Sequence, residues 1–201
     1  MTRRLYLPGA GGSAKFWRPI ASRLNDGADQ RMFAWPGLGD EPPEPKVNGV
    51  DDLIDLVEAE LDAPADLIAQ SMGGLIAVRA LLRRPDKVRR LVLTAASVGL
   101  HARAFGGCDW LPDYLRAYPK AASWVGAPIG DLSDELRTIA SPVLLLWGDS
   151  DPISPPAVGI YLTTLFPNAA LHLIPGGDHD LAQTHAPIVA GLIRQHLGAE
   201  S

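Results

Sequence analysis

A serine among small residues is the first candidate for chemistry. Ser71 stands between Ala69 and Gly73, after the apolar run 67–69 and before a helix-like stretch at 75–82. A strand that turns sharply into a helix exposes such a hydroxyl at the edge of a sheet, and the turn is too tight for large side chains two residues to either side. Small residues around a serine are also common, and many serines only cap a helix. Ser71 is therefore a candidate nucleophile that requires a base and an acid elsewhere.

A histidine and two aspartates in later loops could supply that base and acid. His179 lies in the glycine-containing loop 175–181, which follows an apolar run. A mobile general base in that place could reach Ser71. Asp149 and Asp151 lie in the loop after another apolar run, and a carboxylate there could orient the histidine and stabilise its cation. The residue types alone leave both aspartates open, because turn formation is the structural alternative for either.

The elements that must position these residues alternate along the chain. Apolar runs predict strands at 5–7, 31–35, 66–69, 89–94, 143–147 and 171–174. Amphipathic patterns predict helices near 15–24, 51–61, 72–83, 156–166 and 184–197. This rhythm predicts a mostly parallel, six-stranded sheet with helices on both faces. Residues 100–136 interrupt it with aromatics, glycines and prolines, so we expect a core of 1–99 and 137–201 with a short, partly helical cap at 100–136, all in a single domain.

Composition limits the function classes. The 201 residues suffice for one domain with a full core. A net charge of -5 offers no basic surface for nucleic acid, and no Lys/Arg cluster suggests a membrane anchor. The single cysteine, Cys108, excludes an internal disulfide and is compatible with a reducing compartment. No long apolar stretch follows the arginines at the amino end, so we expect no signal peptide or membrane span and a cytoplasmic location.

The stretch around Ser71 resembles the nucleophile elbow of the α/β-hydrolase superfamily, usually written Gly-x-Ser-x-Gly, with Ala69 at the first glycine position. Ser71, an aspartate and His179 also follow one another in the order serine, acid, histidine that this family uses. The resemblance covers essentially the whole chain, which begins at what is similar to the third strand of the family. It implies an α/β-hydrolase fold and a small serine hydrolase.

The resemblance also implies individual roles. The acid of the family falls three residues after a glycine and precedes a proline-closed loop, which selects Asp151 over Asp149. One oxyanion N–H comes from the residue after the nucleophile, Met72, and the other from Ala10 in the loop after the first strand. Pro8 stands there in place of the histidine that the family usually has.

The implied reaction is covalent acyl transfer without a metal or an organic cofactor. Ser71 attacks a carbonyl, His179 moves the proton and Asp151 orients the imidazole. A short cap and few basic residues favour a small, largely uncharged ester or thioester as substrate. We expect an apolar lining from Phe16, Trp17, Gln70, Phe105, Trp110 and Trp124, for each of which core packing is the alternative.

The sequence is also compatible with other functions. The loop 9–14 satisfies Gly-x-Gly-x-x-Ala, a dinucleotide fingerprint, but the second predicted strand does not end in the acid that would hold a ribose. Asp178, His179 and Asp180 lack further ligands at metal-binding spacing. The same fold also supports carbon–carbon bond hydrolysis, lyase or acyltransferase chemistry, and a non-catalytic ligand-binding module. The sequence leaves the oligomeric state open.

Overall fold

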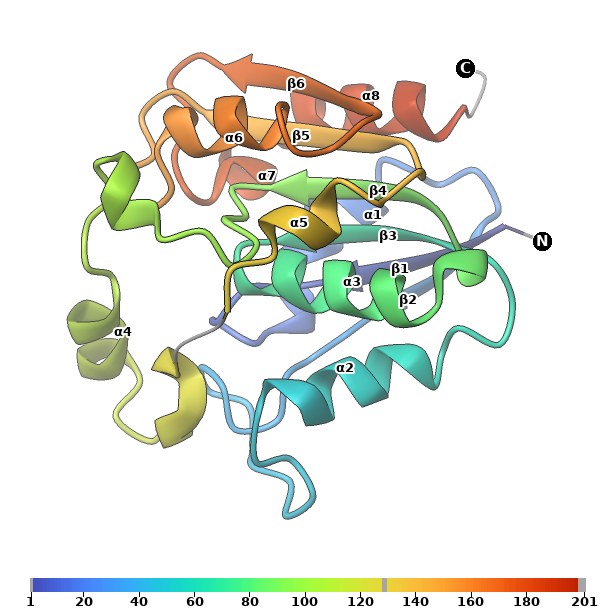
Figure 1. The fold of residues 1–201 in the computed structure, drawn as a ribbon. Coiled ribbons are helices and arrows are strands. Elements are labelled where there is room, and N and C mark those ends of the chain that lie inside the picture. Colours follow the sequence, from blue (N-terminus) through green and yellow to red (C-terminus); the bar gives the residue numbers. More distant parts are fainter. Residues whose placement is uncertain (1, 128–129, 199–201) are drawn as a thin grey trace.

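The computed structural model describes residues 2–127 and 130–198 and contains a single six-stranded sheet in the order β2-β1-β3-β4-β5-β6 (Figure 1). The strands are β1 (Arg3–Leu7), β2 (Asp29–Met32), β3 (Ala65–Gln70), β4 (Val88–Thr94), β5 (Val143–Gly148) and β6 (Ala169–Ile174). Each neighbouring pair is parallel, so the carboxyl ends of all six strands meet at one edge. The expectation of a mostly parallel, six-stranded sheet is confirmed.

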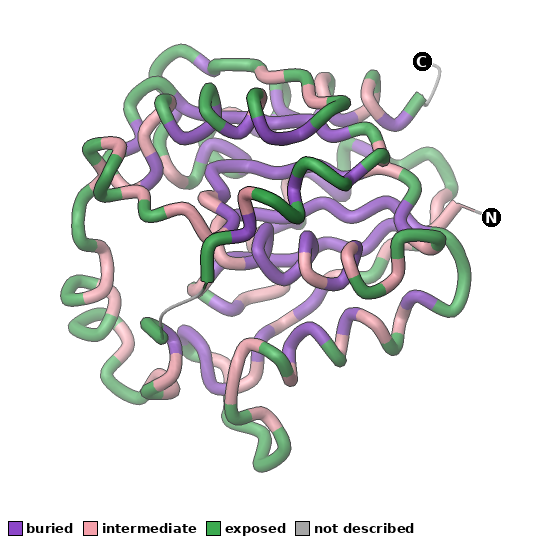
Figure 2. The backbone as a smooth tube through the Cα atoms, in the orientation of Figure 1, coloured by how far each residue is buried: buried purple, intermediate pink, exposed green. Residues whose placement is uncertain are grey.

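The central strands are covered on both faces (Figure 2). Every residue of β3 and of β5 is buried. A parallel sheet covered by helices on both faces needs strands that are apolar throughout rather than alternating, and the run 143–147 has that composition. The central strands therefore form a rigid platform for the loops at their carboxyl ends.

Helices pack in two layers around this sheet. The larger apolar cluster joins one face to α2 (Val50–Glu58), α3 (Met72–Arg83) and α6 (Pro156–Leu162). The second cluster joins the other face to α1 (Arg18–Ala21), α7 (Leu181–Thr184) and α8 (Ala186–Leu197). The loops that lead into α3, α6 and α7 begin at the carboxyl edge of the sheet.

The segment 100–136 lies between β4 and β5 and adds no strand to the sheet among its described residues. It contains η3 (Ala102–Phe105), α4 (Leu111–Ala117), η4 (Ser123–Gly126) and α5 (Ser133–Leu136). Figure 1 shows α4 beyond the carboxyl edge of the sheet, while α5 returns over the face that carries α3. Two further short helices, η1 (Ala14–Trp17) and η2 (Pro85–Lys87), belong to other connections.

Several predicted elements have different bounds in the structure, and for two of them the physical cause is clear. The second strand ends at Met32, because Trp35 turns away from the sheet and donates its backbone N–H to the carbonyl of Gly12 at 2.8 Å. The predicted helix at 184–197 begins at Ala186 as α8, and the separate short helix α7 precedes it across His185. Pro187 has no backbone N–H, so it is tolerated in the first turn of α8 but would interrupt a continuous helix.

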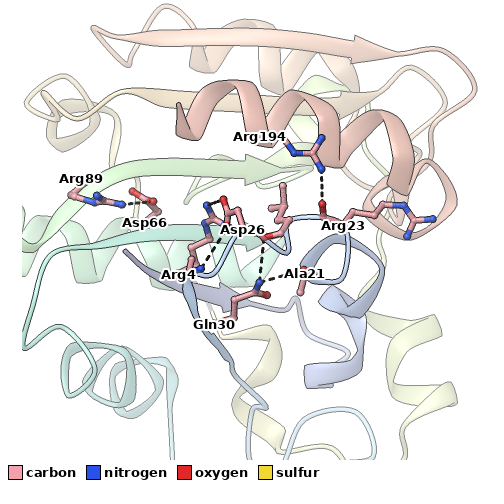
Figure 3. A network of polar contacts seen from close by, with 10 residues as sticks. Arg4, Ala21, Arg23, Asp26, Gln30, Asp66, Arg89 and Arg194 are labelled. Atoms are coloured by element: carbon pink, nitrogen blue, oxygen red, sulfur yellow. Dashed lines mark hydrogen bonds and ion pairs between the residues drawn. The ribbon is translucent and has the colours of Figure 1, made fainter. Parts of the chain in front are cut away.

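A polar network holds the amino ends of the strands, at the edge opposite the serine (Figure 3). The guanidinium of Arg4 is almost fully buried and donates to both carboxylate oxygens of Asp26, at 2.7 and 2.5 Å. The neighbouring pair joins Arg89 to the fully buried Asp66 at 2.6 Å.

None of the helices in the described part of the chain is long and apolar enough to cross a membrane.

Candidate active site

Ser71 occupies the turn between β3 and α3 in a strained backbone conformation. Its φ is 51° and its ψ is -121°, in a region that residues with a side chain rarely adopt. The Ser71 N–H donates to the carbonyl of Thr94 in the adjacent strand at 3.0 Å, and the Ser71 carbonyl accepts from Gly74 at 2.9 Å. These bonds hold the turn, and Ser71 keeps part of its surface accessible.

Close packing explains why small residues surround this serine. A Cβ on Gly73 would lie 2.4 Å from the carbonyl oxygen of Pro8, and one on Gly74 would lie 2.4 Å from the Cβ of Ala96. Ala69 is fully buried in β3. The helix that follows Ser71 can therefore begin close to the end of β1 only if position 73 is glycine.

The loop after β6 brings His179 to the serine. The Nε2 atom of His179 lies 3.0 Å from the Oγ atom of Ser71, and its Nδ1 atom lies 2.9 Å from Oδ2 of Asp151. The carbonyl of His179 accepts from the side-chain amide of Gln70 at 3.3 Å, which ties this loop to the end of β3. Three side chains from three separate loops thus form one hydrogen-bonded chain at the carboxyl edge.

Asp151 is fixed as an acceptor for this histidine. Its side chain is fully buried, and Oδ1 accepts from the backbone N–H groups of Ile153 at 2.8 Å and Ser154 at 3.0 Å. Hydrogen bonds to the ionised form stabilise a buried carboxylate. Asp149 is exposed and instead accepts from the N–H of Gly176 at 2.8 Å, which supports the turn. The structure therefore places Asp151, and not Asp149, against His179.

The loop after β1 presents the backbone beside Ser71. The indole Nε1 of Trp35 donates to the carbonyl of Pro8 at 2.7 Å, and Gly12 donates to the carbonyl of Gly9 at 3.0 Å. Within the described residues, no hydrogen bond occupies the N–H of Ala10 or that of Met72. Met72 is the first residue of α3, where N–H groups lack a partner within the helix and favour negative charge.

The residues predicted to line a pocket fall into two groups. Gln70 is buried and bonds the His179 loop, and Trp17 is fully buried against Tyr6 and Phe16. In this conformation the Trp17 ring has no surface to offer a ligand. Four other predicted lining residues are half-buried and retain exposed surface: Phe16, Phe105, Trp110 and Trp124.

The sequence analysis gave no role to Tyr114 on α4. Its hydroxyl donates to the carbonyl of Ala10 at 2.8 Å and accepts from the N–H of Gly39 at 2.9 Å. No local sequence pattern predicts this contact, because Tyr114 and Ala10 are separated by 104 positions in the chain.

Among residues 2–127 and 130–198, no group of three or more His, Cys, Asp or Glu side chains is placed to hold a metal ion.

Comparison with known proteins identifies the family. The model of the Alpha/beta hydrolase family matches residues 5–191. The chain belongs to this family. The resemblance noted in the sequence is thereby confirmed.

Several relatives of this α/β hydrolase are named as esterases. A pimeloyl-[acyl-carrier protein] methyl ester esterase of Neisseria meningitidis serogroup A is 30% identical over 79% of this chain and 65% of its own length. The matched region thus spans slightly less than two thirds of that relative. A protein of the same name from Chromobacterium violaceum is 25% identical over 83% of this chain and 82% of its own length.

Solved structures share the fold at lower identity. A meta-cleavage product hydrolase superimposes with a TM-score of 0.78 and 19% identity, covering all of this chain and 92% of the other. Naproxen esterase from Bacillus subtilis gives a TM-score of 0.75 and 18% identity, covering 98% of this chain and 83% of the other. These likenesses establish the α/β-hydrolase fold.

Proposed function

We propose that this α/β hydrolase is a serine esterase that cleaves small, largely uncharged esters or thioesters through an acyl-enzyme. The single observation that carries the proposal is the hydrogen-bonded chain from Ser71 through His179 to Asp151. A nucleophile, a base and an orienting acid within hydrogen-bond reach of one another are what acyl transfer to a serine requires. The relatives named as methyl ester esterases support an ester bond as the target.

In the acylation step, the Oγ of Ser71 attacks the carbonyl carbon while its proton passes to Nε2 of His179. Asp151 accepts the hydrogen bond from Nδ1 and stabilises the imidazolium that results. The backbone N–H groups of Ala10 and Met72 receive the oxyanion. The bond to the leaving oxygen or sulfur then breaks, and His179 returns the proton to the departing alcohol or thiol.

Deacylation repeats these movements with water. His179 removes a proton from the water that attacks the acyl carbon, and Ser71 leaves with the proton from the imidazolium. The net change is the hydrolysis of one ester into an acid and an alcohol. Every step uses side chains and backbone groups of the chain, so the proposed reaction involves no metal or organic cofactor.

The segment 100–136 is the proposed cap over this site. The N–H of Cys108 donates to the carbonyl of Pro152 at 2.7 Å, in the loop that carries Asp151. Both arginines of the segment, Arg103 and Arg116, are paired with Asp109 and Asp113, which supports a largely uncharged substrate. The half-buried rings of Phe105, Trp110 and Trp124, together with Phe16, are the proposed apolar lining.

The first test is hydrolysis of p-nitrophenyl and methyl esters of increasing acyl length, with Ser71→Ala alongside. We expect wild-type turnover and a loss of at least a thousandfold in the variant, because the nucleophile is removed. Equal turnover by wild type and variant would exclude a covalent mechanism through Ser71. Absence of turnover at every length, with the protein folded, would favour another reaction on this fold or a ligand-binding module.

The single, exposed cysteine supports a reducing compartment, and we propose a cytoplasmic location for the enzyme.

A further inference from the structure

The hydroxyl of Tyr114 joins three separate parts of the chain. Tyr114 belongs to α4, Ala10 to the loop after β1, and Gly39 to the turn 36–40. A backbone N–H can only donate, so Gly39 must donate to the tyrosine oxygen at 2.9 Å. The single hydroxyl proton is then directed to the carbonyl of Ala10 at 2.8 Å. Both hydrogen bonds therefore have a defined direction.

These bonds act on the residue that carries the proposed oxyanion N–H. The N–H of Ala10 shares a planar peptide group with the carbonyl of Gly9, which accepts from Gly12 at 3.0 Å. The following peptide group contains the Ala10 carbonyl, which is held by Tyr114. With the peptide groups on both sides of Ala10 fixed, its two backbone dihedral angles are fixed as well. The direction of its N–H follows from them.

The turn 36–40 packs tightly against the same loop. A Cβ on Gly39, whose φ is +56°, would lie 2.1 Å from the carbonyl oxygen of Gly11. A Cβ on Gly12 would lie 2.5 Å from the carbonyl oxygen of Leu38. The turn thus supports the loop from one side, and Tyr114 closes the contact from the α4 side.

The surroundings of Tyr114 keep its ring in place and its hydroxyl protonated. The ring meets Trp110 edge-on at 5.5 Å and Tyr118 at 5.0 Å between centroids. Burial raises the pKa of Tyr114 above its ordinary value, so the hydroxyl stays a donor through neutral and mildly alkaline pH. Because Tyr114 belongs to α4, the position of its hydroxyl depends on the position of that helix.

We propose that Tyr114 is a positioning residue for the oxyanion hole. From its place in the 100–136 segment, Tyr114 fixes the direction of the Ala10 N–H and so couples this segment to catalysis. The inference rests on the proposed esterase function. The proposal predicts that loss of this one hydroxyl, which bonds the Ala10 carbonyl, weakens transition-state binding without weakening substrate binding. Removal of a whole oxyanion donor typically costs about a hundredfold or more, so loss of its positioning should cost about tenfold.

The test compares Tyr114→Phe with Tyr118→Phe, since no hydrogen bond of the Tyr118 hydroxyl is recorded in the described structure. With a p-nitrophenyl ester, we expect kcat of Tyr114→Phe to fall about tenfold at a KM within twofold of wild type. Its affinity for a trifluoromethyl ketone, whose adduct oxygen occupies the oxyanion hole, should fall by the same factor as kcat/KM. Tyr118→Phe should stay within twofold of wild type in all three quantities.

Two kinetic results would overturn the proposal: unchanged kcat in a folded Tyr114→Phe protein, or a change confined to KM. Phenylalanine retains the ring contacts of a half-exposed position, and circular dichroism with thermal unfolding checks the fold. The amide resonances of Ala10 and Gly39 give a readout that does not depend on activity. If wild type hydrolyses no ester, the esterase proposal fails, and amide shifts in Tyr114→Phe but not in Tyr118→Phe would still support the positioning of Ala10. Unchanged resonances would overturn it.

Discussion

At the scale of single residues, the two aspartates of one loop have separate tasks. Asp151 is buried and uses one oxygen for His179 and the other for two backbone N–H groups. Asp149 is exposed and accepts from Ser150 and Gly176. The chemical type is the same, so the difference comes from position: Asp151 is directed inward over the end of β5, and Asp149 is directed to the neighbouring loop.

This difference predicts the outcome of exchanging each carboxylate for an amide. Asp151→Asn should lower kcat by a factor on the order of a thousand or more, because an amide does not hold the imidazole in the tautomer that accepts the Ser71 proton. Asp149→Asn keeps an acceptor for Gly176 and should stay within about threefold of wild type. Steady-state hydrolysis of a p-nitrophenyl ester measures both. A larger loss in Asp149→Asn than in Asp151→Asn would show that Asp149, rather than Asp151, is the acid that orients His179.

At the scale of elements, the turn from β3 into α3 depends on its contact with β1. A Cβ on Gly73 would approach the carbonyl oxygens of both Pro8 and Leu7, at 2.4 and 2.5 Å. Neither oxygen belongs to a flexible side chain, so the backbone would have to move. Since Pro8 begins the loop that carries Ala10, such a movement would change the elbow and the proposed oxyanion donor together.

Gly73→Ala should therefore lose both stability and activity. We expect the free energy of unfolding to fall by about 2 kcal/mol, as for overpacking at a closed site, and kcat to fall at least tenfold. Gly191→Ala on α8 is the matched control, because a Cβ there meets nothing within 4 Å and alanine favours a helix. Urea unfolding and ester hydrolysis measure the two effects. A Gly73→Ala protein with wild-type values of both would show that the contact at Pro8 can relax without consequence.

The sequence predicted these elements well where the pattern is local. The order of strands and helices follows from apolar runs separated by turn residues, and the elbow from small residues around Ser71. The early end of β2 was not predictable, because a bond from Trp35 to Gly12 ends it and these residues lie on different elements. Tyr114 was missed for the same reason. Contacts between distant segments depend on the packing of the folded chain, which one sequence does not reveal.

At the scale of the whole molecule, the candidate active site and the network of Arg4, Asp26, Asp66 and Arg89 occupy opposite edges of the sheet. The hydrogen-bonded side chains of Ser71, His179 and Asp151 lie at the carboxyl ends of the strands. The network of Arg4, Asp26, Asp66 and Arg89 lies near their amino ends (Figure 3). The strands of the sheet, of which β3 and β5 are buried throughout, separate the two sets. Changes in the amino-end network should therefore alter stability without altering the geometry around His179.

Asp26 makes this separation measurable through its dependence on pH. The hydrogen bonds from Arg4 lower the pKa of Asp26 below its ordinary value. A carboxylate whose pKa is depressed by folding stabilises the native state above its unfolded pKa of about 3.9, and this contribution is lost as the pH falls through the folded pKa. Asp26→Asn should lower the free energy of unfolding by about 2 kcal/mol at pH 7, because it leaves the buried Arg4 without its counter-charge.

The deficit of Asp26→Asn relative to wild type should begin to shrink as the pH falls below about 4, where the carboxylate of the unfolded wild type takes up a proton, and should be lost only below the lower pKa of the native carboxylate. Burial raises the pKa of Asp66, which acts in the opposite sense, but Asp66 is present in both proteins and cancels in the comparison. Urea unfolding at pH 7, 5, 4 and 3 measures the deficit, with the exposed Asp29→Asn as control. Ester hydrolysis at pH 7 should be unchanged in both variants. A deficit that stays constant down to pH 3 would mean that the charge of Asp26 contributes nothing and that only its packing matters.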